Sequence, residues 1–358
     1  MITIIYPYRN RESERVKRSL DSLKEQTNSE FEVLLVDYGS DSLSASIIKE
    51  LVSNYKFVKY IYNYSEFQPW SRAKAINIGL KNVTTEYIFT ADVDMIFSSN
   101  FISKLYELKN PIKGYYFKVG FLNEKESKSD KKFEDFKIDF SSEVGAQGLS
   151  LFNLESLKAV TAYDEFLHFW GAEDIDVHNR LEKNGTESVF YSEEILMLHQ
   201  WHTSYRKAEK KVLTKDLQLT DIVRINYQKL LGNIQNKRAE VNNSNWGIGI
   251  SENDFEDLKK DDKEILMFNK KEIITHFLFS ELPNFKDGIL NLRFIKDPFQ
   301  NSLKYKMKKL LGKKVPKYYT LKEINDLLLL HTISFYHTLP YFLEVSDDLN
   351  SISFKIKK

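Results

Sequence analysis

The feature that most constrains the fold is an alternation of short apolar runs with segments of helical periodicity over the first two-thirds of the chain. Apolar runs at 2–6, 32–37, 57–62, 87–91 and 115–119 are expected to be strands. Between them, residues 12–26, 42–53, 71–82 and 101–108 repeat apolar side chains at helical spacing. This alternation predicts an α/β fold, in which a Rossmann-like, mostly parallel sheet carries helices on both faces.

The pattern changes near Thr214, where helical segments joined by Lys-, Asn- and Asp-rich connections begin. We place the boundary between Tyr205 and Leu217 and assign residues 1–212 to the α/β domain and residues 213–358 to a mainly helical region. The run 327–343 has no formal charge, but it contains Pro340 and is shorter than a membrane span requires, so we expect a buried helix there. The helical region could serve acceptor binding, membrane contact or oligomerisation, and the sequence does not choose between these roles.

Composition excludes several classes of protein. The net charge of +1 over 358 residues argues against a dedicated nucleic-acid binder. The chain has no cysteine, which rules out disulfides and thiolate metal sites and favours a reducing, cytoplasmic compartment. The turn after the first expected strand is Pro7-Tyr8-Arg9-Asn10-Arg11, without the glycines that a dinucleotide-binding fingerprint needs.

The pair Asp92-Val93-Asp94 directly follows the apolar run 87–91. Open α/β sheets bind ligands at the carboxyl edge of their strands, and two carboxylates there suit Mg²⁺ or Mn²⁺ carrying a phosphate. His199 and His202 follow later in the chain and could complete an oxygen-rich site, although a lone histidine is more often structural. Asp-x-Asp also occurs by chance in loops, so the pair alone is weak evidence.

Three further segments are expected at the same edge. The turn 7–11 offers an aromatic face and the guanidinium groups of Arg9 and Arg11, which match phosphate geometry; the alternative is a charged helix start. Asp37 ends the second strand and could accept a hydrogen bond from a base or ribose. Ser71 can cap a helix whose first turn carries Arg72 toward an anion site, although an ordinary amphipathic helix fits equally well.

The fourth segment is Trp170-Gly171-Ala172-Glu173-Asp174-Ile175-Asp176. Carboxylates are favoured at a helix start by the macrodipole, which explains part of this cluster. The preceding Trp-Gly pair adds a stacking surface and a close backbone approach. A carboxylate beside an aromatic ring suits sugar chemistry, because the ring stacks on the sugar while the acid takes a proton from a hydroxyl.

Taken in order, these segments resemble the GT-A glycosyltransferases, especially the β-1,4-galactosyltransferases and related bacterial family 2 enzymes. The resemblance spans about residues 2–202 and rests on the turn 7–11, on Arg72-Ala73-Lys74 with Asn77 and Gly79, on 92–94, on the glycine segment 145–150 and on 170–181.

The resemblance implies a role for each position. Asp174 would be the general base. Residues holding the donor nucleotide would be Pro7, Tyr8, Arg9, Arg11, Asp37, Arg72, Asp92 and Val93. Residues contacting the sugars would be Gly148, Trp170, Gly171 and Glu173. Metal ligands would be Asp94 with His199 or His202, and Asp92 as a further candidate.

Two departures from the family pattern bear on these roles. The family's Met-x-x-His pair is replaced here by Met197-Leu198-His199, which leaves open which histidine binds the metal and slightly favours His199. Many relatives carry two acids after the second strand, where this chain has Asp37-Tyr38.

The implied function is a metal-dependent, inverting transfer of a hexose from a UDP-sugar, with Mn²⁺ or Mg²⁺, to a carbohydrate or lipid-linked glycan in bacterial surface polysaccharide synthesis. Galactose and N-acetylgalactosamine are the leading donors, by resemblance only. Alternatives are a catalytically inactive sugar-binding or scaffold protein and, third, a sugar-nucleotide pyrophosphorylase, although the Gly-rich basic loop typical of the latter is absent. The acceptor, the linkage and the oligomeric state are not specified by the sequence.

A separate feature is the lysine-rich segment, residues 303–317, in which Leu303, Met307, Leu310 and Leu311 share one face of an expected helix. A basic amphipathic helix can lie on an anionic leaflet, which would place the protein peripherally on the inner face of the cytoplasmic membrane. A helix packed on its own domain explains the pattern equally well.

Overall fold

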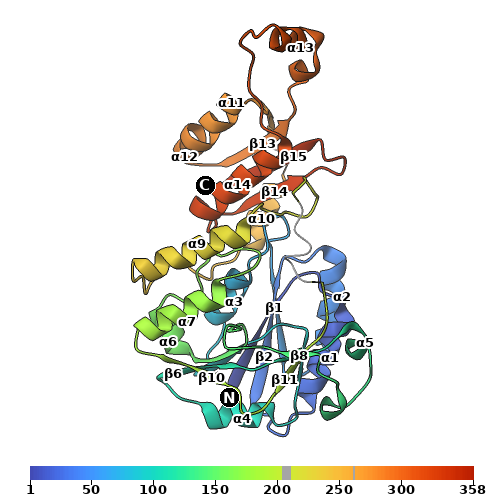
Figure 1. The fold of residues 1–358 in the computed structure, drawn as a ribbon, viewed down its shortest axis with the longest axis vertical. Helices are drawn as coiled ribbons and strands as arrows, with labels where there is room; N and C mark the ends of the chain where they lie inside the picture. The colour runs from blue at the N-terminus through green and yellow to red at the C-terminus, as the bar shows by residue number, and fades with distance from the viewer. Residues whose placement is uncertain (204–210, 261–262) are drawn as a thin grey trace. The chain divides into compact units, whose positions relative to one another are not determined.

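A computed structural model describes residues 1–203, 211–260 and 263–358, which form two compact units (Figure 1). The described residues of the first unit are 1–66, 70–203 and 223–249, and those of the second are 67–69, 211–222, 250–260 and 263–358. Tyr205, one limit of the predicted boundary, lies outside the described residues. Residues 223–249 follow that boundary in sequence and nevertheless pack with the first unit.

The first unit is built on a seven-stranded sheet. Six of its strands point in the same direction, and the exception is β9 (Ser150–Asn153), which is antiparallel to both of its neighbours, β4 (Tyr87–Thr90) and β6 (Lys113–Phe117). Ile2 of β1 (Ile2–Tyr8) lies opposite Phe31 on one side and Tyr87 on the other. The predicted mostly parallel α/β sheet is confirmed. In spatial order the strands are β10 (Glu187–Tyr191), β6 (Lys113–Phe117), β9 (Ser150–Asn153), β4 (Tyr87–Thr90), β1 (Ile2–Tyr8), β2 (Phe31–Tyr38) and β3 (Val58–Asn63).

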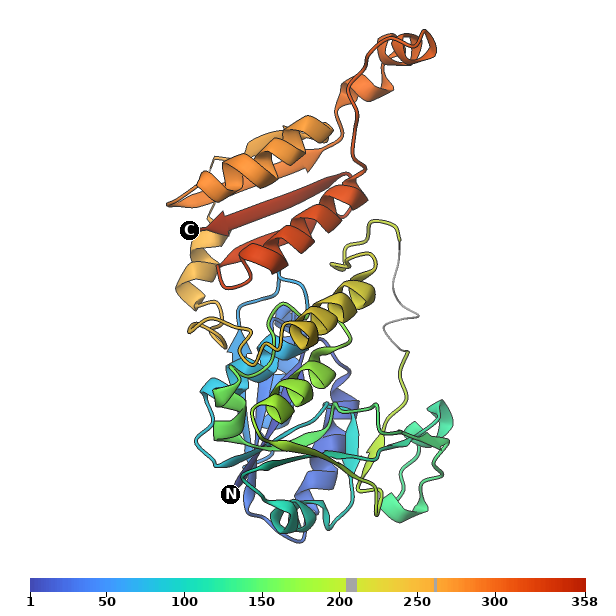
Figure 2. The same cartoon turned by 60° about the vertical axis from the view of Figure 1, so that its left-hand side comes forward.

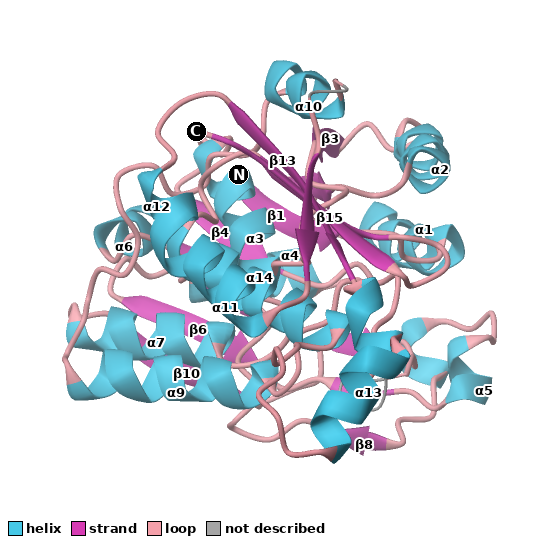
Figure 3. Cartoon of the chain, turned by 90° about the horizontal axis from the view of Figure 1, so that it is seen from above, coloured by secondary structure: helices cyan, strands magenta, loops and turns pink. Residues whose placement is uncertain are grey.

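Helices cover both faces of this sheet, which explains why β1 is apolar at successive positions (Figure 3). Ile4 of β1 belongs to one core cluster, which also contains residues from α1 (Ser13–Lys24), α2 (Ser42–Val52) and α4 (Phe101–Leu108). Ile5 belongs to the opposite cluster, with residues from α3 (Arg72–Lys81), α6 (Leu154–Ala159) and α7 (Glu173–Lys183). Helix α9 (Ile222–Gln235) runs beside α7 (Figures 1 and 2).

Two glycines are required by close packing around β1 and β2. A Cβ on Gly39 would lie 2.3 Å from the carbonyl carbon of Ser65, and its φ of +75° is one that side chains disfavour. A Cβ on Gly79 would lie 2.8 Å from Cγ2 of Ile5, so this glycine allows α3 to pack closely on β1.

A second, smaller sheet continues the first unit beyond β4. Its strand β5 (Met95–Phe97) follows Asp94 directly and pairs antiparallel with β11 (Met197–His199), so that Met95 lies opposite His199. The fold thereby brings Asp94 and His199 together from positions more than a hundred residues apart. The remaining elements are β7 (Gly120–Phe121), α5 (Glu124–Ser127), η1 (Phe133–Asp135) and β8 (Phe140–Ser141).

The second unit contains a four-stranded sheet that the prediction of a mainly helical region omitted. Its strand order is β12 (Ile265–Phe268), β13 (Ile289–Ile295), β15 (Ser351–Lys357) and β14 (Tyr341–Val345). The helical elements are α10 (Glu252–Lys259), α11 (Lys271–His276), the π-helical turn η2 (Phe277–Glu281), α12 (Leu282–Asn284), η3 (Pro298–Asn301), α13 (Leu303–Leu310) and α14 (Leu321–Phe335).

The prediction of one buried helix over 327–343 is wrong at both ends. Helix α14 begins at Leu321, after a capping box between Thr320 and Glu323, and it ends at Phe335. Residues 341–343 instead belong to β14, since Pro340 cannot continue a helix. Among the described residues, no helix is both long and apolar enough to span a bilayer.

Candidate active site

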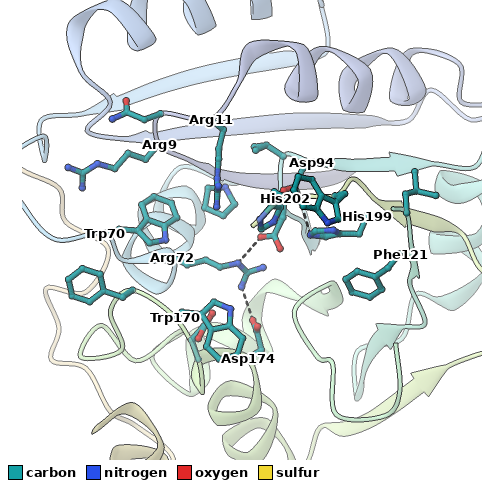
Figure 4. Close-up of a pocket in the computed structure, with 18 of the residues that line it drawn as sticks. Arg9, Arg11, Trp70, Arg72, Asp94, Phe121, Trp170, Asp174, His199 and His202 are labelled. Atoms are coloured by element: carbon teal, nitrogen blue, oxygen red, sulfur yellow. Dashed lines mark hydrogen bonds and ion pairs between the residues drawn. The ribbon is translucent and has the colours of Figure 1, made fainter. Parts of the chain in front are cut away.

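A cavity of about 760 Å³ opens at the carboxyl ends of β1 and β4, where the sequence placed the candidate residues (Figure 4). Most of the predicted site residues line it: Pro7, Arg9, Arg11, Arg72, Asp92, Val93, Asp94, Trp170, Glu173, Asp174, His199 and His202.

Arg72 connects two sides of this cavity. It is the first residue of α3, and the hydroxyl of the preceding Ser71 caps the helix by accepting from the Lys74 N–H. Its Nε donates to Asp92 Oδ1 at 2.9 Å and its Nη1 to Asp174 Oδ1 at 2.7 Å. Its Nη2 donates to the carbonyl oxygen of Gly148 at 2.8 Å. Figure 4 shows the guanidinium between the two carboxylates.

Gly148 does not line the cavity, but it leaves room for this arrangement. A Cβ at its position would lie 3.1 Å from Asp174 Oδ2. The glycine therefore allows its own carbonyl and the Asp174 carboxylate to approach Arg72 together.

The acidic cluster stands at the start of α7, after an unusual backbone. Phe169, Gly171 and Ala172 have φ values of +64°, +94° and +77°. Asn226 of α9 holds this loop by donating to the carbonyl oxygens of His168 at 2.9 Å and Trp170 at 3.1 Å. Strained backbone of this kind persists only where surrounding contacts enforce it, and it is typical of ligand sites.

The electrostatics of the three acids around Arg72 differ. Burial, reinforced by the charge of Asp174, raises the pKa of Glu173 to about 7. Burial also raises the pKa of Asp174, against the opposing effect of Arg72. Burial would raise the pKa of Asp92 as well, but the ion pair with Arg72 outweighs burial, so the pKa of Asp92 is lowered. The site thus pairs an ionised Asp92 with two carboxyl groups of increased proton affinity, as acid–base chemistry requires.

Asp94, His199 and His202 form a group that could hold a metal ion, with ligand atoms within 4.8 Å of one another. Asp94 Oδ2 lies 3.3 Å from His202 Nε2, and Asp94 Oδ1 lies 3.8 Å from His199 Nε2. The chain is fixed here by a backbone hydrogen bond of 3.0 Å from Gln200 N–H to the Asp94 carbonyl. Both histidines that the sequence suggested as ligands therefore lie close enough to Asp94 to share a metal ion with it.

Two observations fit a cation between these side chains. Asp94 Oδ1 is buried and accepts no hydrogen bond from any residue that the structure describes. His202 Nδ1 lies 3.0 Å from the Thr203 carbonyl oxygen, which can only accept, so Nδ1 carries a proton. A neutral His202 would then present a lone pair on Nε2 to a carboxylate, an arrangement that needs a proton or a metal ion between them.

Three predicted site residues lie outside the cavity lining in addition to Gly148. Tyr8 is buried, and its hydroxyl donates to the Arg11 carbonyl at 2.9 Å. Asp37 is buried, and it accepts from Ser40 N–H and from the Tyr60 hydroxyl, each at 2.8 Å. Gly171 contributes its backbone bend. Nucleotide contacts of Tyr8 and Asp37, and a sugar contact of Gly171, stay predictions.

One wall of the cavity consists of residues that the sequence did not predict. Phe121 of β7 and Phe140 of β8 stack with ring centroids 4.6 Å apart, and Phe121 also contacts the His199 ring at 4.9 Å. Strands of two residues are too short to show a period, so no sequence signal marked them. Other lining residues without an assigned role are Asn10, Trp70, Leu122, Asn123, Asp139, Phe169 and Trp201.

Comparison with known proteins agrees with this architecture. Residues 3–137 match the family model described as glycosyl transferase family 2. Residues 128–203 match the model described as N-terminal domain of galactosyltransferase.

Several solved glycosyltransferase structures are similar to the chain. S. aureus TarS 1–349 in complex with UDP matches with a TM-score of 0.47 and 14% identity, over 97% of this chain and 94% of that one. GalNAc-T7 with UDP, GalNAc and Mn²⁺ matches with a TM-score of 0.49 and 13% identity, over 66% of this chain and 49% of that one. Mannosyltransferase PcManGT from Pyrobaculum calidifontis, in complex with GDP-Man and Mn²⁺, matches with a TM-score of 0.42 and 18% identity. This match covers 58% of this chain and 59% of that one. The chain thus spans less than two-thirds of the length of the last two.

Proposed function

The chain belongs to the family 2 glycosyltransferases of GT-A fold and carries a galactosyltransferase segment, and from this premise we propose that it moves a hexose from a UDP-sugar to a glycan acceptor with inversion. The observation that carries the proposal is the cavity in which Arg72 joins Asp92 to Asp174 beside the Asp94, His199 and His202 group.

Asp174 is the proposed general base. As the acceptor oxygen forms its bond to the anomeric carbon, its proton passes to the Asp174 carboxylate. The bond from that carbon to the diphosphate oxygen breaks on the opposite face, and the nucleoside diphosphate leaves with the electron pair. The raised pKa of Asp174 suits this role, because proton affinity assists proton transfer.

Asp94, His199 and His202 would hold Mn²⁺ or Mg²⁺, and Asp92 stands nearby as a further oxygen donor. When bound, such an ion neutralises the charge that develops on the departing diphosphate. Arg9 and Arg11, from the turn after β1, would bind the phosphates. Trp170, which Figure 4 shows beside Asp174, would stack on a sugar ring, and Glu173 would bind sugar hydroxyls.

The test is release of UDP from a panel of UDP-sugars by the full chain, with Mn²⁺ and with EDTA. We expect one donor to be hydrolysed or transferred only with metal, and Asp94→Ala to abolish this. Asp174→Asn should lower turnover roughly 10²–10⁴-fold while UDP binding, measured by calorimetry, is retained.

Glu182→Gln is the matched control, because Glu182 lies exposed on the same helix α7. Unchanged turnover in Asp174→Asn would remove Asp174 from the role of base. UDP binding without turnover of any donor would indicate a sugar-binding or scaffold protein. Release of pyrophosphate from UTP and a hexose 1-phosphate, with no UDP release from any UDP-sugar, would indicate a pyrophosphorylase.

A further inference from the structure

Helix α13 of the second unit presents an apolar surface that no described residue of that unit covers. Figure 2 shows the segment that carries it extending from the sheet of this unit. The exposed fractions of Leu303, Met307, Leu310 and Leu311 are 78%, 61%, 88% and 64%. At 100° per residue these four side chains fall within about a third of the helix circumference, so they form one continuous stripe.

The opposite face of α13 is the one that anchors the helix. Tyr305 points away from the stripe, and its ring contacts Phe299 at 5.7 Å and Tyr318 at 5.6 Å. Tyr318 in turn donates to Asp297 Oδ2 at 3.0 Å. The stripe is therefore not the face by which α13 packs on its own unit. The sequence left that alternative open, and these contacts count against it.

Charge identifies the kind of partner. The lysine-rich segment, residues 303–317, contains seven lysines and no acid. Lys304 and Lys306 flank the stripe on its two sides at helical spacing. None of the seven forms an ion pair with the residues that the structure describes. A symmetric contact with a second copy would bring two such clusters together, and like charges would oppose it.

We propose that α13 and its lysines form a contact for an anionic lipid leaflet, into which the stripe inserts while the lysines meet the headgroups. Apolar burial and attraction to anionic lipid together are what hold an interfacial helix on a membrane. Seven lysines within fifteen residues also match the size of a lipid-recognising basic cluster. This inference rests on the second unit alone and stands whether or not the proposed transfer reaction is correct.

The test is co-sedimentation of the full chain with vesicles of phosphatidylglycerol and phosphatidylcholine in equal parts, and with phosphatidylcholine alone. We expect binding to the anionic vesicles only, weakened by 0.5 M NaCl because salt screens the lysines. Lys304→Gln with Lys306→Gln should lower the partition coefficient roughly 25-fold, since each lysine near the leaflet contributes about fivefold. Met307→Ser with Leu310→Ser should lower it roughly tenfold or more.

Matched controls come from the first unit. Leu43→Ser changes a leucine of α2 that is 69% exposed, and Lys24→Gln with Lys49→Gln changes two exposed lysines. Circular dichroism checks that every variant is folded. No binding of the wild-type chain to anionic vesicles overturns the proposal, as does equal loss in the control variants. A wild-type dimer in light scattering that Met307→Ser with Leu310→Ser abolishes, without vesicle binding, would assign the stripe to a second copy instead.

Discussion

Replacing Glu173 by glutamine should stabilise the first unit at pH 8 and have little effect near pH 4.5. Glu173 is buried, and burial together with the charge of Asp174 raises its pKa from 4.5 to about 7. The folded state therefore binds a proton more tightly than the unfolded state. The stabilisation from this proton is complete below pH 4.5, decreases as the pH rises, and is lost above about pH 7.

The size of the effect follows from the shift. A change from 4.5 to about 7, at 1.36 kcal/mol for each unit, corresponds to about 3 kcal/mol. Glutamine is neutral at every pH and nearly isosteric, so the variant avoids the cost of ionising a buried carboxyl. The free energy of unfolding of Glu173→Gln should exceed that of the wild type by up to about 3 kcal/mol at pH 8.

Urea unfolding followed by tryptophan fluorescence measures this directly, because Trp70, Trp170, Trp201 and Trp246 all belong to the first unit. Metal should be removed with EDTA, so that ion binding adds no stability of its own. Glu182→Gln, on the same helix but exposed, should show no pH-dependent difference. A Glu173→Gln variant whose advantage does not grow between pH 5 and pH 8 would refute the reasoning.

The remaining predictions concern the bend at residues 169–172 and the histidines beside Asp94. Asn226→Leu removes the two hydrogen bonds to the carbonyls of His168 and Trp170, so it should cost about 1–3 kcal/mol in urea unfolding and raise KM for the acceptor. Asn236→Leu, at an exposed position just after the same helix, is the control. His199→Ala and His202→Ala should each weaken Mn²⁺ binding measured by calorimetry. His276→Ala, in the second unit, is the control and should leave Mn²⁺ binding unchanged. Full retention of Mn²⁺ affinity in His199→Ala or His202→Ala would exclude that histidine as a ligand.

The sequence predicted the layers of the first unit well because its strands are buried on both faces. The observed β1, Ile2–Tyr8, extends the predicted run 2–6 by two residues, and α4 has the predicted limits, Phe101–Leu108. Long apolar runs and caps such as Ser71 carry enough local signal for this. Convergence of Arg72, Asp94 and Asp174 followed from the rule that the carboxyl ends of parallel strands share one edge.

Two kinds of feature were not predicted from the sequence. Some depend on contacts between residues far apart in the chain, and one depends on an alternation of apolar and polar residues that was overlooked. The ring stack of Phe121 and Phe140 is set by pairing between two-residue strands. Strand β15 alternates buried and partly buried side chains strictly, from Ile352 to Ile356, and this period of two could have identified it. The bend at 169–172 depends on Asn226 of a helix more than fifty residues later, which no local pattern can report.

The geometry of Arg72 also bears on whether one side chain can bind the nucleotide-sugar and orient the general base at the same time. A guanidinium has five N–H donors. Three of them are engaged with Asp92, Asp174 and Gly148, which leaves two without a partner among the described residues. Arg72 can thus orient Asp174 through Oδ1 and still offer donors to an anionic ligand. Oδ2, beside the side-chain-free Gly148, is the oxygen left to take a proton. Asp174→Asn should therefore reduce turnover far more than nucleotide binding, because it removes the basic oxygen and retains a carbonyl that Arg72 can hold.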